Sequence, residues 1–303
     1  MNFQELKNQI QSKIFGEVSL NYPLSQHTSF KIGGNADLYV CPNNLMELLI
    51  TVELCIAAKA QYFLLGAGSN LLISDKGIRG VVIKLGEGFD YAHAKGDYIL
   101  AGAGVSLAKL SAEAKNAELT GLEFASGIPG SMGGAIYMNA GAYGGEMKDV
   151  ITEVSYIDDD GAVKTISGED CGFGYRKSIF TKGNKIIISA KLTLKKGNKD
   201  EILATMRDLN ARRKEKQPLE YPSAGSTFRR PEGHFAGALI ESSGLKGTRI
   251  GGAEVSEKHA GFIINADNAT ARDVLDLIAH VQKVVKEKHG VDLEPEVKII
   301  GEL

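Results

Sequence analysis

The sequence predicts an α+β protein built from several packed units, and two observations carry that prediction. At 303 residues the chain is too long for one small core. Its pattern also changes along its length, from a β-α-β arrangement at the start, through a β-hairpin near the middle, to two long helices at the end. We predict three parts, covering residues 1–85, 86–197 and 198–303.

The first part reads as a small β-α-β unit. Its expected elements are a short helix within the first 20 residues, a strand at 37–41, a helix at 44–60, and strands at 62–65 and 80–85. Asn44 is the expected N-cap of the longer helix, because Glu47 follows it at capping distance.

The second and third parts have different patterns. In the second we expect a strand at 98–102, a helix at 106–119, a hairpin at 151–166 that turns at 158–161, and a strand at 185–194. In the third we expect helices at 200–216 and 271–288 and a final strand at 296–300. Thr270 and Asp273 have the spacing of a capping box for the last helix.

Composition and charge disfavour several classes of function. A formal net charge of −2 gives no overall field to attract DNA or RNA, so we expect no nucleic-acid partner. The N-terminus lacks the apolar centre of a signal peptide, and the most apolar long stretch, 45–60, is interrupted by Glu47 and Glu53. We therefore expect a cytoplasmic protein that does not enter a membrane.

The cysteines and histidines give no sign of a disulfide framework or a metal site. Cys41, Cys55 and Cys171 are odd in number and far apart, which fits a reducing compartment. The six histidines have no metal-ligand spacing with each other or with cysteine, so we predict no metal.

Two glycine motifs resemble a dinucleotide-binding turn but are incomplete. The third glycine of the G-x-G-x-x-G pattern is replaced by Leu71 after residues 66–70 (GAGSN) and by Leu107 after Gly102. No Gly-Lys pair exists for a phosphate-binding P-loop. Residues 66–70 are either a simple tight turn or a nest of backbone N–H groups that approaches a pyrophosphate.

The densest glycine run covers residues 121–145, with eight glycines in 25 residues. That density argues against a regular helix or strand through the segment, whereas the interleaved apolar residues argue against a disordered linker. A bare, ordered backbone suits the close approach of a large flat cofactor. Packing of the protein's own backbone against itself is the alternative explanation.

Ordered blocks along nearly the whole chain resemble one family, the UDP-N-acetylenolpyruvoylglucosamine reductases. The blocks are HTSFKIGG (27–34), GAGSNLLISD (66–75), SGIPGSMGGAIYMNAGAYG (126–144), GYRKSIF (174–180), KQPLEYPSAGSTFRRP (216–231), IGGAEVS (250–256) and EVKIIG (296–301). The short segment between Gly174 and Ser226 resembles the type II form of these enzymes.

The resemblance implies an FAD-binding fold of the vanillyl-alcohol-oxidase (PCMH) type. It implies two FAD-binding subdomains, here 1–85 and 86–197, and a C-terminal α+β substrate-binding domain at 198–303. The first glycine loop has no histidine for a covalent link, so the FAD should be noncovalent. The family uses NADPH as hydride donor and reduces UDP-N-acetylglucosamine enolpyruvate to UDP-N-acetylmuramate for peptidoglycan, through the flavin N5 atom. We expect a monomer, although the sequence itself does not show the oligomeric state.

The resemblance also assigns residues to roles. Arg176 and Glu296 match the residues that stabilise the enolate formed on the substrate, and Ser226 matches the serine that supplies the proton. The substrate diphosphate would be bound by Lys216, Arg229 and Arg230. Relatives often carry lysine where this chain has Ala238. Residues implied at the cofactor are Gly66, Gly68, Ser69, Asn70, Ser126, Gly127, Ile128, Pro129, Gly130, Ser131, Gly133, Gly134, Asn139, Gly141 and Arg213.

Without the resemblance, the individual signals are weaker. Ser226 lacks the second glycine of a G-x-S-x-G nucleophile motif, and Arg176 would ordinarily be a solvated surface cation. Two alternative functions stay open at this stage. One is a flavin oxidase of the same fold that acts on an alcohol, and the other is a non-catalytic protein that binds UDP-sugars.

Overall fold

The computed structural model describes residues 1–302, in which the chain forms two compact units. Unit 1 comprises Met1–Leu20, Leu38–Ala67 and Gly80–Arg213, and unit 2 comprises Asn21–Asp37, Gly68–Arg79 and Lys214–Leu303. The units interleave along the sequence, so the three-part division at 85 and 197 stays a prediction.

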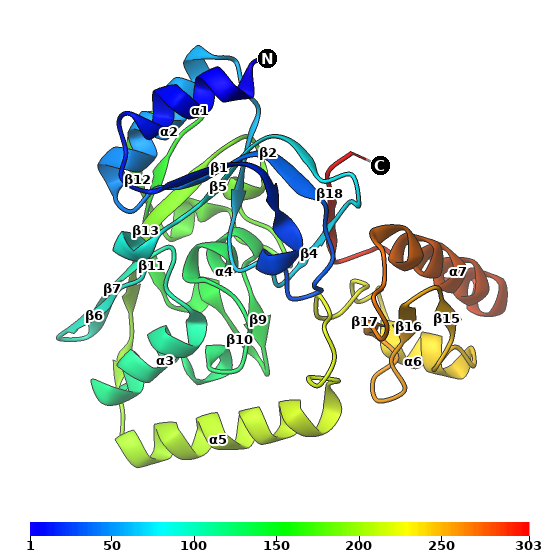
Figure 1. The fold of residues 1–303 in the computed structure, drawn as a ribbon. Helices are drawn as coiled ribbons and strands as arrows, with labels where there is room; N and C mark the ends of the chain where they lie inside the picture. Colours follow the sequence, from blue (N-terminus) through cyan, green and yellow to red (C-terminus); the bar gives the residue numbers. More distant parts are fainter. Residues whose placement is uncertain (303) are drawn as a thin grey trace. The chain divides into compact units, whose positions relative to one another are not determined.

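The N-terminal elements are a four-stranded sheet and two helices. They are α1 (Phe3–Gln11), β1 (Glu17–Pro23), β2 (Asn35–Cys41), α2 (Leu45–Ala57), β3 (Tyr62–Leu65) and β5 (Ile78–Lys84). The sheet has the order β1-β2-β5-β3, with β3 and β5 parallel, and α1 packs beside α2 (Figure 1). The predicted N-cap is confirmed, because the Asn44 side chain accepts a hydrogen bond of 3.0 Å from Glu47 N.

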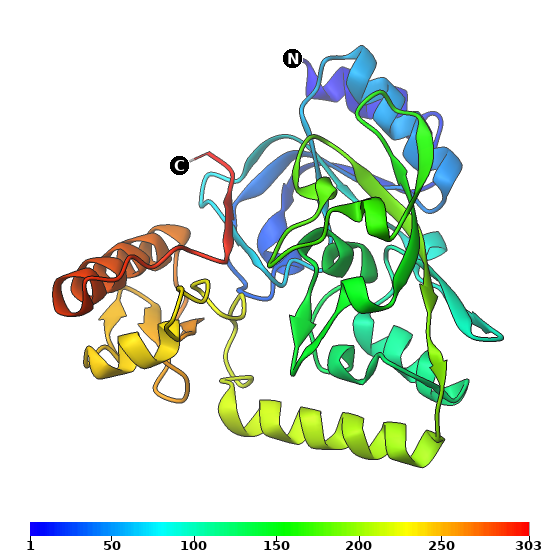
Figure 2. The same ribbon diagram turned by 180° about the vertical axis from the view of Figure 1, so that it is seen from behind.

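A five-stranded antiparallel sheet forms the centre of unit 1. Its strands are β6 (Ala92–Lys95), β7 (Tyr98–Gly102), β11 (Ile151–Ile157), β12 (Val163–Ser167) and β13 (Ile186–Thr193), in the order β12-β11-β13-β7-β6. The predicted hairpin is therefore confirmed as β11 and β12, and β13 is their neighbour in the same sheet. Figure 2 shows these strands, in green, from behind. Helix α3 (Leu107–Asn116) follows β7.

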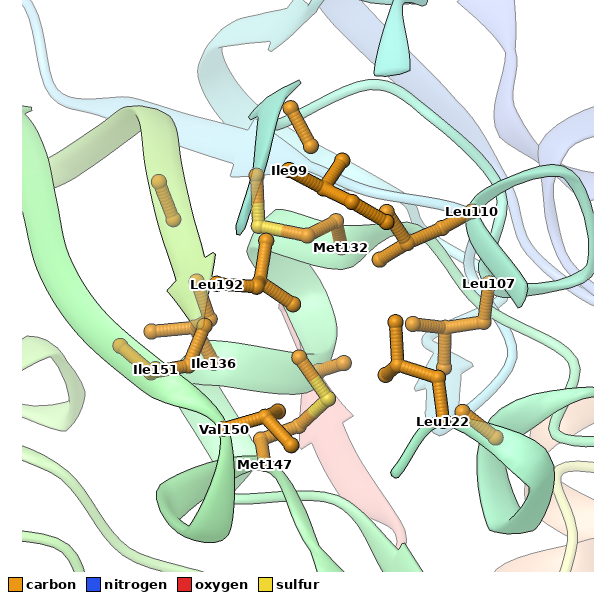
Figure 3. Close-up of a cluster of buried hydrophobic side chains, with 14 of the residues drawn as sticks. Ile99, Leu107, Leu110, Leu122, Met132, Ile136, Met147, Val150, Ile151 and Leu192 are labelled. Atoms are coloured by element: carbon orange, nitrogen blue, oxygen red, sulfur yellow. The ribbon is translucent and has the colours of Figure 1, made fainter. Parts of the chain in front are cut away.

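No helix or strand runs through the whole glycine-rich run, as predicted, but the run contains one short helix, α4 (Met132–Met138), which the sequence did not predict. Glycine lowers helix propensity, but tertiary packing overrides that preference. Met132 and Ile136 are fully buried in the same cluster as Ile99 and Leu192 of the sheet, as Figure 3 shows. This burial of apolar side chains stabilises a helix that its local sequence would not form alone.

The remaining elements of unit 1 are short, apart from the helix that ends it. They are β8 (Leu119–Thr120), β9 (Gly141–Ala142), β10 (Gly145–Glu146), β14 (Lys195–Lys196) and α5 (Lys199–Lys216). Unit 1 also has the short 3-10 helices η2 (Glu87–Phe89), η3 (Glu123–Ala125), η4 (Met147–Asp149), η5 (Glu169–Cys171) and η6 (Ile179–Thr181), whereas η1 (Leu24–His27) belongs to unit 2.

Unit 2 combines a small antiparallel sheet with two helices and a separate parallel pair of strands. Its elements are β4 (Leu71–Ile73), α6 (Ala236–Ser242), β15 (Arg249–Ile250), β16 (Ala253–Val255), β17 (Ile263–Asn265), α7 (Ala271–His289) and β18 (Lys298–Ile300). Helix α7 packs against β15 and β16, and β18 pairs in parallel with β4 (Figure 1). Periodicity predicted α7 but not α6 or β15–β17, which are too short to give a clear pattern.

The cysteines are three free thiols. Burial raises the pKa of Cys55 to about 12 and that of Cys171 to about 11, so both are protonated at neutral pH. Within residues 1–302, no helix combines the length and apolar character needed to cross a membrane.

The first turn of α7 is capped from two sides. Thr270 and Asp273 form the predicted capping box, in which the Thr270 hydroxyl accepts from Asp273 N. The Asp75 carboxylate accepts hydrogen bonds of 2.8 Å from Ala271 N and 3.1 Å from Arg272 N. Asp75 thus satisfies two backbone donors that a helix N-terminus leaves unpaired, and it joins the loop after β4 to α7.

We predict that Asp75→Ala lowers the free energy of unfolding by about 1–2 kcal/mol, because both N–H groups lose their acceptor. Asp75→Asn is the matched control. It keeps one amide oxygen as an acceptor and should lose about half as much. Urea unfolding followed by circular dichroism measures both changes, and equal stability of Asp75→Ala and the unaltered chain would contradict the capping role.

Candidate active site

The glycine-rich run of residues 121–145 lies in unit 1 and is tied to its core. Ser131 caps α4 by accepting a hydrogen bond of 3.4 Å from Gly134 N. Gly133 N donates to Ala103 O at 2.9 Å, which fixes the start of α4 against the loop after β7. The backbone of the run is therefore held in place by the protein itself.

Four glycines of the run are needed for close packing within the protein. At each of them an added Cβ atom would come too close to another residue. That residue is Asn210 for Gly127, Ala103 for Gly133, Gly145 for Gly141 and Phe124 for Gly145. A Cβ atom added to Gly133 would lie only 2.9 Å from the Cβ of Ala103, and one added to Gly145 would lie 2.6 Å from the Phe124 ring. Backbone packing, the alternative explanation of the run, thus accounts for part of its glycine content.

Other glycines have open space beside them. Gly134 is exposed, and a Cβ added there would meet only the Ser131 hydroxyl, at 3.4 Å. A Cβ added to Gly66 would meet only the same hydroxyl, at 3.2 Å. Nearby, Ile128 and Gly130 are half-buried and Pro129 is exposed. Bare backbone is therefore available around Ser131, as the approach of a planar ligand requires.

Helix α5 contributes a buried arginine next to this run. The Arg213 side chain is only 8% exposed, and its Nη1 donates a hydrogen bond to Gly127 O. Its Nε has no hydrogen-bond partner among residues 1–302. One turn earlier, Asn210 Nδ2 donates to the Ser126 hydroxyl at 3.3 Å. A buried N–H group without an acceptor costs free energy. A ligand with an anionic or carbonyl oxygen, such as FAD, would supply that acceptor.

In the first glycine loop, 66–70, the part from Gly68 onward belongs to unit 2 and is shaped by neighbours in that unit. Gly68 has φ +66°, and a Cβ there would overlap His27 O. Ser29 N donates to Gly68 O at 3.2 Å, so the block that contains His27 packs directly on this loop. Ser69 is half-buried. Asn70 Nδ2 donates to Glu296 O at 3.3 Å, which connects the loop to a predicted catalytic residue.

Ser226 and Glu296 are brought together within unit 2. Ser226 is exposed, between Gly225 at φ +74° and the buried Thr227. Glu296 N donates to Thr227 O at 2.8 Å, and the next residue of that segment, Val297, leads into β18. Two residues 70 positions apart in the sequence therefore lie on adjacent, hydrogen-bonded segments.

The three predicted phosphate-binding cations have different surroundings in the structure. Lys216 is exposed at the end of α5. Arg229 pairs with Glu294 at 3.5 Å, while its buried Nε has no partner within residues 1–302. The Arg230 guanidinium lies 4.0 Å from the centre of the Phe235 ring, in a cation–π contact. Ala238, where relatives often have lysine, is exposed on α6.

Arg176 lies in unit 1, on a tight turn over residues 174–177. Gly174 N donates to Lys177 O at 3.0 Å, and Lys177 N donates back to Gly174 O at 3.2 Å. Arg176 has φ +53°, a left-handed conformation that costs a non-glycine residue free energy. Its guanidinium lies 5.2 Å from the centre of the Tyr175 ring.

Asn139, predicted to contact the cofactor, has a side chain engaged with the protein. It is 1% exposed, and Nδ2 donates to the Glu146 carboxylate at 2.7 Å and to Gly174 O at 3.2 Å. Its Oδ1 accepts from Lys148 N at 2.9 Å. The hydrogen bonds of the Asn139 side chain are thus made to the protein itself. That Asn139 binds the cofactor stays a prediction.

Sequence reasoning assigned no role to several residues that support the Ser226 loop. The Thr227 hydroxyl accepts from Ile263 N at 3.0 Å, and Thr227 N donates to Gly261 O at 2.9 Å. The Ser29 hydroxyl donates to Ser223 O at 2.6 Å. Thr227 and Ser29 both belong to the blocks that carry the family resemblance, but pairings over such sequence distances leave no local signal.

Within residues 1–302, no three His, Cys, Asp or Glu side chains are grouped so that they could hold a metal ion.

Comparison with known proteins gives these features a family. Residues 36–167 match the FAD binding domain model, and residues 217–300 match the model of the UDP-N-acetylenolpyruvoylglucosamine reductase C-terminal domain. The UDP-N-acetylenolpyruvoylglucosamine reductase of Caldanaerobacter subterraneus subsp. tengcongensis is 54% identical over 95% of each chain. That of Lachnoclostridium phytofermentans is 51% identical over 99% of this chain and 97% of its own.

A solved structure agrees with this result. The crystal structure of the reductase from Thermus caldophilus superposes with a TM-score of 0.81 at 39% identity, covering 94% of this chain and 98% of that one. The predicted α+β class, with an FAD-binding region followed by a C-terminal domain, is confirmed. The chain belongs to the UDP-N-acetylenolpyruvoylglucosamine reductase family and is an FAD-dependent oxidoreductase.

Proposed function

We propose that the chain reduces UDP-N-acetylglucosamine enolpyruvate to UDP-N-acetylmuramate, a step in peptidoglycan precursor synthesis, with noncovalent FAD and with NADPH as hydride donor. The observation that carries the proposal is the 2.8 Å hydrogen bond from Glu296 N to Thr227 O. It holds the glutamate expected to stabilise an enolate beside the serine expected to protonate it.

The cofactor would be held where the backbone is bare. Bound FAD supplies hydride transfer from NADPH to the terminal carbon of the enolpyruvyl group. Arg213 Nε, which has no hydrogen-bond partner within residues 1–302, would donate a hydrogen bond to the cofactor. The open backbone at Gly66 and Gly134 would let the cofactor approach. The other residues of the proposed cradle are Gly68, Ser69, Asn70, Ser126, Gly127, Ile128, Pro129, Gly130, Ser131, Gly133 and Gly141.

The chain's own side chains would handle charge and proton. Addition of hydride to the terminal carbon leaves an electron pair on the adjacent carbon and its carboxylate, an enolate. Arg176 would stabilise that negative charge, and Glu296 is the second residue that the resemblance assigns to the enolate. The Ser226 hydroxyl would then transfer its proton to the carbon, which completes the addition of H⁻ and H⁺ across the double bond.

The substrate diphosphate would be neutralised by Lys216, Arg229 and Arg230. Arg229 is partly compensated by Glu294, so we expect Arg230 and Lys216 to carry more of this binding. We also propose that the protein works in the cytoplasm. We propose in addition that it is a monomer, and sedimentation equilibrium would test this oligomeric state.

The absorption spectrum and a turnover assay test this function directly. The purified protein should contain flavin near one equivalent, and NADPH oxidation should depend on the enolpyruvyl substrate. Rapid reoxidation of the reduced protein by oxygen, without substrate, would instead favour a flavin oxidase. Binding of UDP-sugar by a flavin-free protein would favour a non-catalytic role.

We predict that Gly134→Ala separates flavin binding from stability. Alanine is the better helix former, and a Cβ at this position has room, so the flavin-free protein should keep or slightly raise its stability. FAD affinity should fall about tenfold, since the methyl group would occupy the surface against which the cofactor lies. Gly133→Ala is the contrasting control, because it collides with Ala103 and should destabilise the flavin-free protein. Unchanged FAD affinity in Gly134→Ala would remove Gly134 from the cradle.

For Ser226→Ala we predict a selective loss. Stopped-flow absorbance should show that NADPH reduces the flavin at its usual rate, since no substrate proton is involved in that step. Reoxidation by the enolpyruvyl substrate should slow on the order of a hundredfold or more, because the proton donor is absent. Equal slowing of both half-reactions would argue against the proton-donor role.

A further inference from the structure

Asn139 has a backbone conformation that few residues adopt. It ends α4 in the left-handed region, with φ 43° and ψ 58°. Asparagine tolerates that region better than most non-glycine residues, and a helix commonly ends with such a residue. This explains the residue type in part, because glycine would serve the backbone at least as well.

The side chain of Asn139 supplies the reason for asparagine. Both hydrogens of its amide nitrogen are used, one by the Glu146 carboxylate and one by Gly174 O, and its oxygen accepts from Lys148 N. A flipped amide would direct its oxygen at the Glu146 carboxylate, so the charge of Glu146 fixes the orientation. With the amide 1% exposed, each lost bond would leave a buried polar group unsatisfied.

Those contacts lead to the turn that carries Arg176. The turn is joined to α4 at both ends, through Asn139 Nδ2 to Gly174 O and through the Ser178 hydroxyl to Tyr137 O at 2.8 Å. Arg176 itself lies at φ +53°. A left-handed arginine persists only where surrounding contacts determine the backbone, and these two contacts do so.

Glu146 adds a charge to the same arrangement. Hydrogen bonding to Lys148, and then to Asn139, lowers the pKa of Glu146 despite partial desolvation, and the nearby charge of Arg176 lowers it further. Glu146 is therefore ionised at neutral pH, and it is 3.1 Å from Lys148 Nζ. Its anion both orients the Asn139 amide and attracts the guanidinium.

We propose that Asn139 and Glu146 are positioning residues for Arg176, which fix the turn and direct the guanidinium before substrate binds. This inference rests on the role of Arg176 in the proposed function. It assigns to Asn139 a task other than cofactor contact.

Asn139→Gly is the direct test. Glycine keeps the left-handed backbone and removes all three side-chain hydrogen bonds. Stopped-flow should show reoxidation by the enolpyruvyl substrate about tenfold to a hundredfold slower, because Arg176 is misplaced. Flavin content and the rate of flavin reduction by NADPH should not change. Asn268→Gly is the matched control, because Asn268 is another left-handed asparagine, at φ +48°. Within residues 1–302 its side chain bonds only to neighbouring Asp267, so this variant should behave as the unaltered protein.

Glu146→Gln tests the role of the Glu146 negative charge, and this test holds even if the Asn139→Gly variant does not fold. Its amide oxygen can still accept from Asn139, but the anion is lost. Because Glu146 is 37% exposed, the expected slowing of reoxidation is only about two- to fivefold. An unchanged reoxidation rate in both variants would overturn the inference.

Arg176→Ala separates this inference from the proposed function. If it slows reoxidation to a rate that is still measurable, adding Asn139→Gly should slow the reaction no further, because there is no guanidinium left to position. Two results would overturn the inference while the proposed function stands. Either both half-reactions slow in Asn139→Gly, or the rate effects of Arg176→Ala and Asn139→Gly multiply in the double variant. In both cases Asn139 supports the structure in general. If Arg176→Ala leaves reoxidation unchanged, the role of Arg176 fails and the inference fails with it.

Discussion

The candidate active site of unit 2 depends on one short parallel pairing, that of β18 with β4. Lys298 is paired with Leu71, and Ile300 with Ile73, across more than 220 positions of sequence. Parallel strands need a crossover connection, and closing so long a connection costs conformational entropy that packing of the intervening chain must offset. Once it is made, Glu296 is placed beside Asn70 on one side and Thr227 on the other. Glu296, the proposed catalytic glutamate, therefore has its position set by the strand that follows it.

Much of the fold could be predicted from local sequence because its signals are local. The Asn44 cap, the Thr270–Asp273 capping box and the β11–β12 hairpin each depend on residues a few positions apart. Helix α4 could not be predicted, because its stability comes from Met132 and Ile136 packing into a distant sheet. Asn139 shows the same limit at the site. Its hydrogen-bond partners Glu146 and Gly174 are 7 and 35 positions away in the sequence. The motif that contains Asn139 therefore suggested contact with a ligand, not hydrogen bonds to other parts of the protein.

The glycine-rich run has two separate physical tasks, which its composition alone could not distinguish. At Gly133 and Gly145 the missing side chain lets protein segments pack closely, whereas at Gly134 it leaves an exposed strip of bare backbone. At the second kind of position a ligand can lie directly against the side of the residue that has no Cβ. Arg213 Nε, which has no hydrogen-bond partner within residues 1–302, lies beside the same run, where it would give the proposed cofactor a hydrogen-bond donor.

The proposed acid, Ser226, raises a chemical question that its surroundings help to answer. A serine hydroxyl is a weak acid, so it donates a proton usefully only to a strong base such as an enolate carbon. The donor must then be positioned before the enolate forms, because a mobile one would compete poorly with water. Thr227, next in the chain, is anchored through its N–H, its carbonyl and its hydroxyl, to Gly261, Glu296 and Ile263. The backbone next to Ser226 is thereby fixed, and the hydroxyl keeps only the rotations about its Cα–Cβ and Cβ–Oγ bonds.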